Sequence, residues 1–506
     1  MKPYWALVAA VLIFVLTAMP FLPRLGIETD EAMLASGIYD HGDPWYSWKI
    51  GSAEIPVMLI SYLGALKTWL YNPYFLIVHP GPVSLRIPNV LFGVAALWLF
   101  FALLRRLAGD MAASIGVLLL ATDSMFLLIG ATDFGFVALQ FVLKLAALLL
   151  LWRFHRGGFR AALAGGFFLF GLGMWDKAVF SWVLFGLAAG AIVGFPRELR
   201  KYATARNLAI AALAMLAGAS PLVIYNLARP LETFRANAHL GREPVFAKAL
   251  FALHTMNGNA LFGFLTAPGP GPRPGPVHWL ASLNVRHNLI LPALALSIAA
   301  SVFRKRSAPQ RFALAVCIAT FLPMAFTAGA GGAVQHSILL WPFHLLILAA
   351  TVAWLPLPWA SAVTAALCLA NLAVTNQYYA DLVRNGPGVR WTDAIDPLNR
   401  YLNASKAERI FIADWGFMET LNLMNEGELP LYFGATADDA MAGRIVSSPR
   451  HLFVAHTPEM TFLPEIRAHL ERQARQSGFE EEHLATISDR NGRPTFDVFR
   501  FRKIHL

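Results

Sequence analysis

The sequence predicts a mainly α-helical protein that crosses a membrane many times (residues 1–376) and ends in an outer α/β domain (residues 377–506). Three observations lead to this fold class. Of the 506 residues, 57% are hydrophobic and 14% are charged, which gives too little polar surface for a soluble globule. The apolar residues gather in runs of about 20, the length that crosses a bilayer. Beyond residue 377 these runs stop. The only cysteines, Cys317 and Cys368, lie in apolar runs and indicate no disulfide framework.

Basic residues in the short loops orient the predicted spans. Arg105, Arg106 and the run Arg304–Arg306 are among the basic clusters that follow every second span. Such clusters mark cytoplasmic loops, so we expect a cytoplasmic N-terminus and an outer C-terminus in the plasma membrane, which is the inner membrane in bacteria. The basic cytoplasmic loops then account for the net charge of +10, so no nucleic-acid partner is expected. About eleven spans are predicted, at residues 4–22, 84–104, 111–130, 134–152, 161–176, 178–195, 207–226, 287–303, 311–328, 337–354 and 358–376.

Two long loops are expected on the outer face, at residues 23–83 and 227–286. In the first loop, residues 54–80 are predicted to form an amphipathic or re-entrant interfacial helix. A full span there would place the basic loop at Arg105 and Arg106 outside and Asp133 inside, against the preference of basic residues for the cytoplasmic side. In the second, Val245–Phe264 is expected to form a similar surface helix. Pro268–Pro276 alternates proline with glycine almost throughout and predicts a stiff, extended linker.

Short patterns predict the elements of the outer domain. Arg409–Asp414 and His451–Ala455 have the pattern of buried strands, and Pro464–Ser477 has that of a helix. An Asn-Gly pair separates His483–Ile487 from Thr495–Phe501, which favours a hairpin. A small α/β domain is therefore expected after the last span.

Three carboxylates fall within four residues directly after the first span: Glu28, Asp30 and Glu31. Charges at bilayer depth are costly, so these residues should lie on the water side and serve either topology or chemistry. The predicted threading places further polar candidates on the same outer face, namely Asp133, Lys177, the 227–286 loop and His336.

At this point the chain resembles the type C glycosyltransferases, and within them the branch of protein O-mannosyltransferases and lipid A aminoarabinose transferases. The order and spacing of several elements carry the resemblance, over residues 1–355. These elements are the acidic pair after the first span, Glu54 before a proline, Leu85–Gly93 at the second span, Asp133 at the fourth, Gly171–Lys177 and His336–Pro342.

The resemblance implies the type C fold and the transfer of one sugar, with inversion, from a polyprenyl-phosphate donor to a protein, lipid or glycan acceptor. It implies that Asp30 acts as general base, with Glu31 and Asp133 as further catalytic candidates. The chemistry is consistent with the residue types, because a sugar hydroxyl becomes a good nucleophile when a carboxylate takes its proton. Membrane lipids would surround the donor's tail.

The departing lipid phosphate needs cations where negative charge develops. Arg86, Lys177 and Arg242 are the predicted donor-phosphate ligands, together with His336.

A set of carboxylates could also hold a divalent metal ion through oxygen ligands. Glu54, Asp30 and Asp133 form the candidate set.

Each candidate also has a structural interpretation. Asp30 and Glu31 could be solvated loop charges, and Glu54 an interfacial charge. Asp133 could cap a helix, where an acidic side chain is favourable. His336 could be a hydrogen-bonded histidine at a helix end.

Two other function classes stay open. A transporter or lipid flippase would explain Lys144, a charge inside a predicted span, but would also be expected to show inverted repeats, which the sequence lacks. A non-catalytic membrane scaffold would leave the spaced carboxylates without a task.

Overall fold

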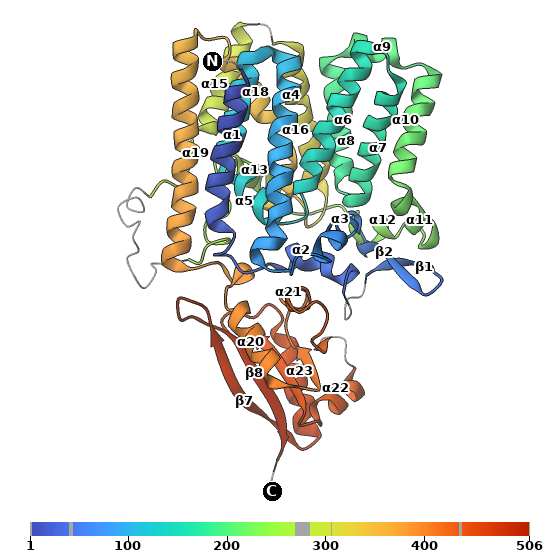
Figure 1. Cartoon of the computed structure of the whole chain (residues 1–506), viewed down its shortest axis with the longest axis vertical. Helices are drawn as coiled ribbons and strands as arrows, with labels where there is room; N and C mark the ends of the chain where they lie inside the picture. The colour runs from blue at the N-terminus through green and yellow to red at the C-terminus, as the bar shows by residue number, and fades with distance from the viewer. Residues whose placement is uncertain (1–2, 40–43, 269–283, 305, 435–437, 505–506) are drawn as a thin grey trace.

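The computed structural model describes residues 3–39, 44–268, 284–304, 306–434 and 438–504. A bundle of long helices forms the upper part of the molecule in Figure 1, and a sheet flanked by helices forms the lower part. The first helix, α1 (Pro3–Ala18), begins at the end of the bundle far from the sheet. The first loop lies between the two parts and can contact both. Of the predicted linker Pro268–Pro276, all but Pro268 lies outside the described residues.

Five described helices are long and apolar enough to cross a membrane, or up to eight helical units if each pair joined at a bend is one span. The predicted count of eleven therefore stays a prediction. The five are Tyr4–Phe21 (α1 with its short extension), α4 (Pro82–Thr122), α6 (Ala138–Gly157), α16 (Ala308–Phe326) and α19 (Leu357–Asn385). The predicted domain boundary at residue 377 falls inside α19, because the helix continues past its apolar part.

The long element α4 contains two of the predicted spans, 84–104 and 111–130 in part. Gly109 interrupts its helical geometry with φ +89°. A methyl group on Gly116 would lie 2.4 Å from the side chain of Leu104, twelve residues earlier. A straight helix would hold residues this far apart at about 18 Å. The chain therefore reverses at Gly109, where the sequence predicts a short basic loop.

Three bends coincide with prolines. The first joins α8 (Phe180–Gly194) to α9 (Pro196–Tyr202) at 104°, and the second joins α10 (Ala205–Gly218) to α11 (Ser220–Ala228) at 69°. The third, at 44°, joins the helical segment Val334–Leu340 to α18 (Phe343–Val352). That segment begins with α17 (Val334–Ser337). Proline lacks the amide hydrogen that the preceding turn needs, so a helix interior bends or ends there. The remaining helices of this part are α5 (Ser124–Thr132), α7 (Arg160–Asp176), α12 (Glu232–Asn237), α13 (Val245–Met256) and α15 (Ile290–Phe303).

Glycines let α8 and α16 approach closely. Gly186, Gly190 and Gly194 recur every fourth residue on α8, and a methyl group on any of them would lie under 3.0 Å from atoms of α16. Small residues at this spacing allow helix backbones in membranes to pack tightly.

Replacing Gly190 with alanine should lower the melting temperature, because the new methyl group would meet Val316 at 2.5 Å. Overpacking of this kind costs about 1–3 kcal/mol. Gly130→Ala is the matched control, since nothing lies within 4 Å of the added atom there. Thermal unfolding of both purified variants in detergent measures the difference, and equal melting temperatures would contradict the packing argument.

The first loop contains a small sheet where the sequence predicts a helix. β1 (Tyr46–Ile50), β2 (Ala53–Ile60) and β3 (Leu63–Gly64) are antiparallel, and only α3 (Leu66–Phe75) is helical within 54–80. The helix prediction is thus wrong for β2 and β3. Residues Gly51 and Ser52 form a two-residue turn with Gly51 at φ +63°, which lets β2 pair with β1. The β-branched residues of β2 also favour an extended chain.

The lower part is a five-stranded sheet in the order β5-β4-β6-β8-β7. β4 (Arg409–Ile412) is parallel to β5 (Leu431–Phe433) and β6 (His451–His456), whereas β7 (Phe479–Ser488) and β8 (Pro494–Lys503) form an antiparallel hairpin. The structure thus has strands at all four predicted places and α23 (Pro464–Gln476) at the predicted helix. The sequence prediction missed the three-residue β5.

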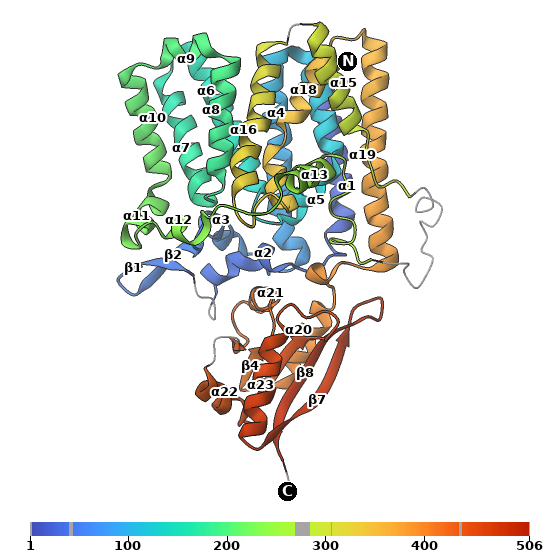
Figure 2. The same cartoon turned by 180° about the vertical axis from the view of Figure 1, so that it is seen from behind.

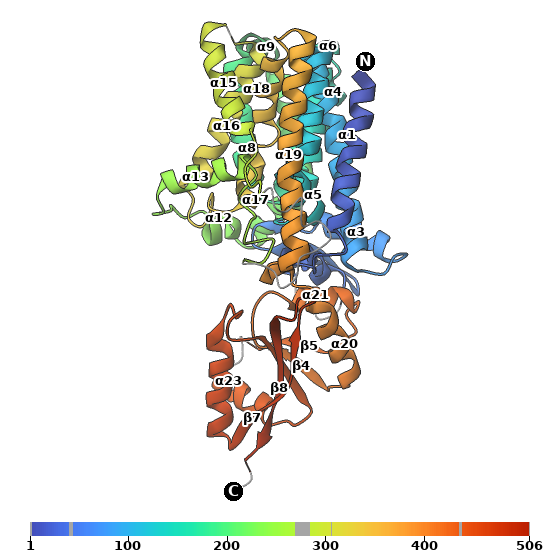
Figure 3. The same ribbon diagram turned by 90° about the vertical axis from the view of Figure 1, so that its left-hand side faces the viewer.

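Helices cover both faces of this sheet. α20 (Ile395–Ser405) and α21 (Met418–Met424) pack on one apolar face, and α22 (Asp439–Val446) and α23 pack on the other. Figure 3 shows α20 and α23 on opposite sides of the strands. α21 lies at the upper end of this part and faces the first loop.

Candidate active site

The acidic loop after α1 is folded so that its three carboxylates have different surroundings. Residues 29–32 form the short helix α2 (Thr29–Ala32), and the side chain of Glu28 caps it by accepting the amide of Asp30 at 2.6 Å. Glu28 and Glu31 are buried, with 1% and 3% of their surface exposed. Asp30 is half-buried. Among the three, Asp30 is therefore the carboxylate that a substrate can reach.

Glu31 is neutralised by Arg86 inside the protein. Its two carboxylate oxygens accept Arg86 Nε at 2.7 Å and Nη2 at 2.9 Å, and the indole of Trp391 donates to Oε1 at 2.7 Å. These three bonds hold both carboxylate oxygens against Arg86 and Trp391 inside the protein, away from an acceptor hydroxyl. The geometry argues against the predicted catalytic role of Glu31.

Arg86 has no donor left for a phosphate. Besides Glu31, its guanidinium donates to the carbonyl oxygens of Leu22, Leu25 and Gly26 at 2.6–2.8 Å, and its exposed fraction is 0%. An arginine has five N–H groups, and these contacts use all of them. Arg86 therefore holds the loop after α1 against α4, and the predicted role as a donor-phosphate ligand does not fit its surroundings.

A segment that follows α19 holds the acidic loop from the other side. Arg390 donates to Glu28 at 3.1 Å, and the carbonyl of Trp391 accepts the amide of Gly26 at 2.8 Å. Gly26 has to be glycine, because a methyl group there would lie 2.0 Å from the carbonyl oxygen of Thr392. The sequence carries no local signal for this contact, which joins residues more than 350 positions apart.

Cations lie close enough to Asp30 to act on its charge. Burial raises the pKa of Asp30, and the positive charges of Lys177 and Arg390 oppose that rise, while Asp133 adds to it. The net result is a raised pKa. Burial also raises the pKa of Glu419, on α21, and the Asp30 charge contributes. The lower part of the molecule thus places a second carboxyl group near Asp30.

Asp133 is paired with a lysine that the sequence prediction missed. Its side chain forms a buried ion pair with Lys67 of α3 and accepts the amide of Ala138 at 2.8 Å. Asp133 has φ +53° and ends α5, and because Ala138 is the first residue of α6, the carboxylate caps the start of that helix as well as pairing with Lys67. Lys67 is 1% exposed. Without this structure, a lysine on a short amphipathic helix is indistinguishable from an ordinary interfacial charge.

Lys177 ends α7 and its ammonium group reaches the same region. Nζ donates to the carbonyl of Gly135 at 2.5 Å, and the following amide, of Ala178, donates to Tyr62 at 2.9 Å. Burial lowers the pKa of Lys177, and the Asp30 charge opposes this. An ammonium group has three N–H donors, so Lys177 retains donors for an anionic ligand. The charges of Lys177 and Asp30 act on each other, and the predicted role of Lys177 as a phosphate ligand stays a prediction.

His336 lies near Lys177, whereas Arg242 does not join the cluster. The charges of Lys177 and Lys248 act on His336, whose ring is 5.9 Å from that of Trp182. Its Nδ1 is buried and has no hydrogen-bond partner among the described residues. Arg242 is exposed on the loop that pairs with residues 326–329, and among the described residues no hydrogen bond or ion pair links it to Asp30. Its predicted role gains no support from the geometry.

The three predicted metal ligands are not assembled into a metal site. Glu54 is exposed on β2 opposite Lys49, and Asp133 is engaged with Lys67. Within the described ranges, no group of three or more histidine, cysteine or acidic side chains is arranged to hold a metal ion. The predicted metal set of Glu54, Asp30 and Asp133 therefore gains no support from the arrangement of the described residues.

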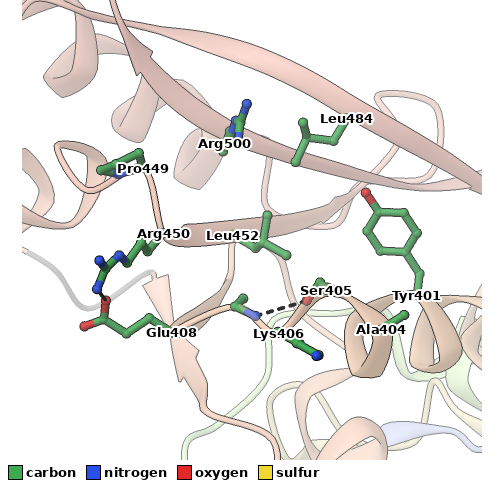
Figure 4. A pocket seen from close by; sticks show the side chains of 11 residues that line it. Tyr401, Ala404, Ser405, Lys406, Glu408, Pro449, Arg450, Leu452, Leu484 and Arg500 are labelled. Carbon is green, nitrogen blue, oxygen red and sulfur yellow. Dashed lines mark hydrogen bonds and ion pairs between the residues drawn. The ribbon is translucent and has the colours of Figure 1, made fainter.

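An open pocket of about 760 Å³ lies on the sheet of the lower part (Figure 4). Tyr401 and Lys406 border it from α20 and its end, Arg450 from the turn before β6, and Arg500 from β8. Arg500 is paired with Glu482 at 2.7 Å. None of the lining residues belongs to the first loop, so this pocket is separate from the Asp30 cluster.

The fold is shared with membrane proteins of known structure. The structure superposes on ArnT from Cupriavidus metallidurans bound to undecaprenyl phosphate with a TM-score of 0.58, over 98% of this chain and 97% of that one, at 13% identity. The chain has the type C glycosyltransferase fold. A second match is the apo oligosaccharyltransferase from Archaeoglobus fulgidus, with a TM-score of 0.51 and 13% identity over 95% of this chain and 69% of that one.

Sequence comparison agrees with this fold. Residues 65–225 match the family described as dolichyl-phosphate-mannose-protein mannosyltransferase. Among curated proteins, no sequence matches the chain. The resemblance to type C glycosyltransferases is thus confirmed, and the chain is an integral membrane protein with the fold of enzymes that use lipid-linked sugars.

Proposed function

We propose that this protein transfers a single sugar, with inversion, from a polyprenyl-phosphate donor to a protein, lipid or glycan acceptor. The observation that carries the proposal is the half-buried Asp30, on whose charge Lys177 and Arg390 act, in a fold shared with a protein crystallised with undecaprenyl phosphate. The site lies at the end of the bundle opposite the basic loops. We therefore place it on the outer face of the plasma membrane, in bacteria the inner membrane, with a cytoplasmic N-terminus.

The proposed reaction is one displacement. Asp30 takes the proton of an acceptor hydroxyl as its oxygen attacks the anomeric carbon of the sugar. The bond from that carbon to the phosphate oxygen breaks, and the oxygen keeps the electron pair. Lys177 is proposed to stabilise the departing polyprenyl phosphate, because its free N–H groups lie in a buried site where such bonds are strong. Lys67 adds positive charge but shares it with Asp133.

The test uses purified protein in lipid nanodiscs and a panel of radiolabelled polyprenyl-phosphate sugars, each with several acceptor classes. Release of polyprenyl phosphate with acceptor labelling would support the proposal and identify the donor. Running the panel with and without a chelator reports on metal dependence. No donor binding or consumption by correctly folded protein across the panel would overturn the proposal and favour a transporter or a scaffold.

The pH dependence should reflect the surroundings of Asp30. The base must be ionised, and burial raises its pKa, so kcat/KM should fall at a pH above the ordinary range of an aspartate as the solution is acidified. Lys177→Gln removes a cation that opposes this rise. The acid limb should then shift to higher pH, together with a loss of rate of about 100-fold or more. Profiles of kcat/KM for both proteins measure this, and an unmoved limb would show that Lys177 does not act on Asp30.

A further inference from the structure

A second cavity is lined in part by α9. Figures 1 and 2 show α9 at the end of the bundle far from the first loop, which contains Asp30. The volume of the cavity is about 700 Å³, within the range of natural ligand sites. The wall comes from α4, α6, α7, α8, α10 and α16. Its apolar lining includes Leu103, Leu148, Leu151, Phe167, Ala211 and Phe312. The interior therefore suits a hydrocarbon chain.

The mouth of the cavity carries two arginines with no acidic partner. Arg106 and Arg156 lie over the ring of Trp152, with guanidinium carbons 5.0 and 5.8 Å from its centre. Among the described residues neither Arg106 nor Arg156 forms an ion pair, and Arg106 donates one N–H to the carbonyl of Ala102 at 2.7 Å. Glu198 is the single acidic residue of the lining. The rim thus has a positive charge and several unused N–H donors.

A tyrosine fixes the position of α9 beside this mouth. The hydroxyl of Tyr202 donates to the carbonyl of His155 at 2.8 Å, and its ring lies 5.0 Å from that of Phe154. On the open side, Leu208 is 58% exposed. The cavity is therefore accessible from the apolar surroundings of the bundle as well as from the rim.

We propose that this cavity binds one anionic glycerophospholipid, with an acyl chain among the leucines and its phosphate at Arg106 and Arg156. The combination of an apolar interior with an unpaired positive rim matches a ligand that has a long hydrocarbon chain and a negative head. Guanidinium groups hold phosphate through paired N–H bonds, and basic residues near a membrane surface attract anionic lipids. This site is independent of the proposed sugar transfer.

Native mass spectrometry of the purified full chain tests the proposal. The protein is exposed to an equimolar mixture of phosphatidylglycerol and phosphatidylcholine with identical acyl chains, and retained lipids are identified. We expect retained phosphatidylglycerol to exceed phosphatidylcholine by about tenfold in the wild type, since two arginines each add to the affinity for the anionic head. The double variant Arg106→Gln, Arg156→Gln should lose this preference.

The control variant is Arg153→Gln. Arg153 lies on the same end of α6 but contacts Phe159 and does not line the cavity, so the preference should persist. Ala211→Phe fills the interior and should reduce retention of both lipids. Equal retention of the two lipids, or the same preference in all variants, would overturn the proposal. Displacement of phosphatidylglycerol by stoichiometric undecaprenyl phosphate in an arginine-dependent manner would also overturn it, and would identify the carrier lipid as the occupant.

Discussion

Asp30→Asn should abolish sugar transfer while leaving the protein folded in the membrane. Asparagine has nearly the same shape but cannot take a proton at neutral pH, so the acceptor hydroxyl loses its base. General-base catalysis contributes about 100- to 10,000-fold, and we expect a fall of this size in the rate of polyprenyl phosphate release. The side chain of Asp30 makes no hydrogen bond that the fold would lose among the described residues.

Donor binding separates this role from a structural one. The proposed phosphate ligand is Lys177, so the Asp30→Asn protein should bind the labelled donor with nearly unchanged affinity and fail to consume it. Glu54→Gln is the matched control, because Glu54 is another carboxylate of the first loop but is exposed on β2. It should retain full activity. Full activity of the Asp30→Asn variant would remove Asp30 from the mechanism, and an inactive Glu54→Gln variant would reopen the role of that carboxylate.

The sequence predicts the parts of the site that follow from topology. The basic loops orient the spans, and that orientation brings Asp30 and Lys177 to one face, where the structure also places them. The predicted apolar runs likewise recur as helices, including the reversal at Gly109. These features depend on composition and local pattern, which a single sequence contains.

The rest of the site depends on tertiary pairing. Lys67 meets Asp133 across 66 positions, and Arg390 meets Glu28 across 362, and no local pattern indicates either contact. The predicted role of Arg86 illustrates the same limit: a cation near a carboxylate cluster can bind substrate or bind the cluster, and only its complete set of hydrogen bonds distinguishes the two. The strand β2 was missed because a short apolar run fits a helix and a strand equally well until its partner is known.

Arg86→Met should destabilise the whole protein rather than weaken donor binding alone. The variant leaves the buried Glu31 without its ionic partner and three backbone carbonyls without a donor. Removing one member of a buried ion pair costs about 3–5 kcal/mol. We therefore expect a clear fall in melting temperature for the purified protein in detergent. Arg242→Met, which removes an exposed arginine, should leave the melting temperature unchanged.

A double-mutant cycle with Glu31→Gln tests the pair itself. Glutamine keeps an oxygen for the indole of Trp391 but carries no charge, so the loss caused by Arg86→Met should be smaller in that background. The recovery should be incomplete, because the carbonyls of Leu22, Leu25 and Gly26 still lack their donor. If Arg86→Met instead kept the wild-type melting temperature and raised only the KM for the donor, Arg86 would be a phosphate ligand after all. The loop that presents Asp30 would then depend on another anchor, the bond from the Gly26 amide to the Trp391 carbonyl.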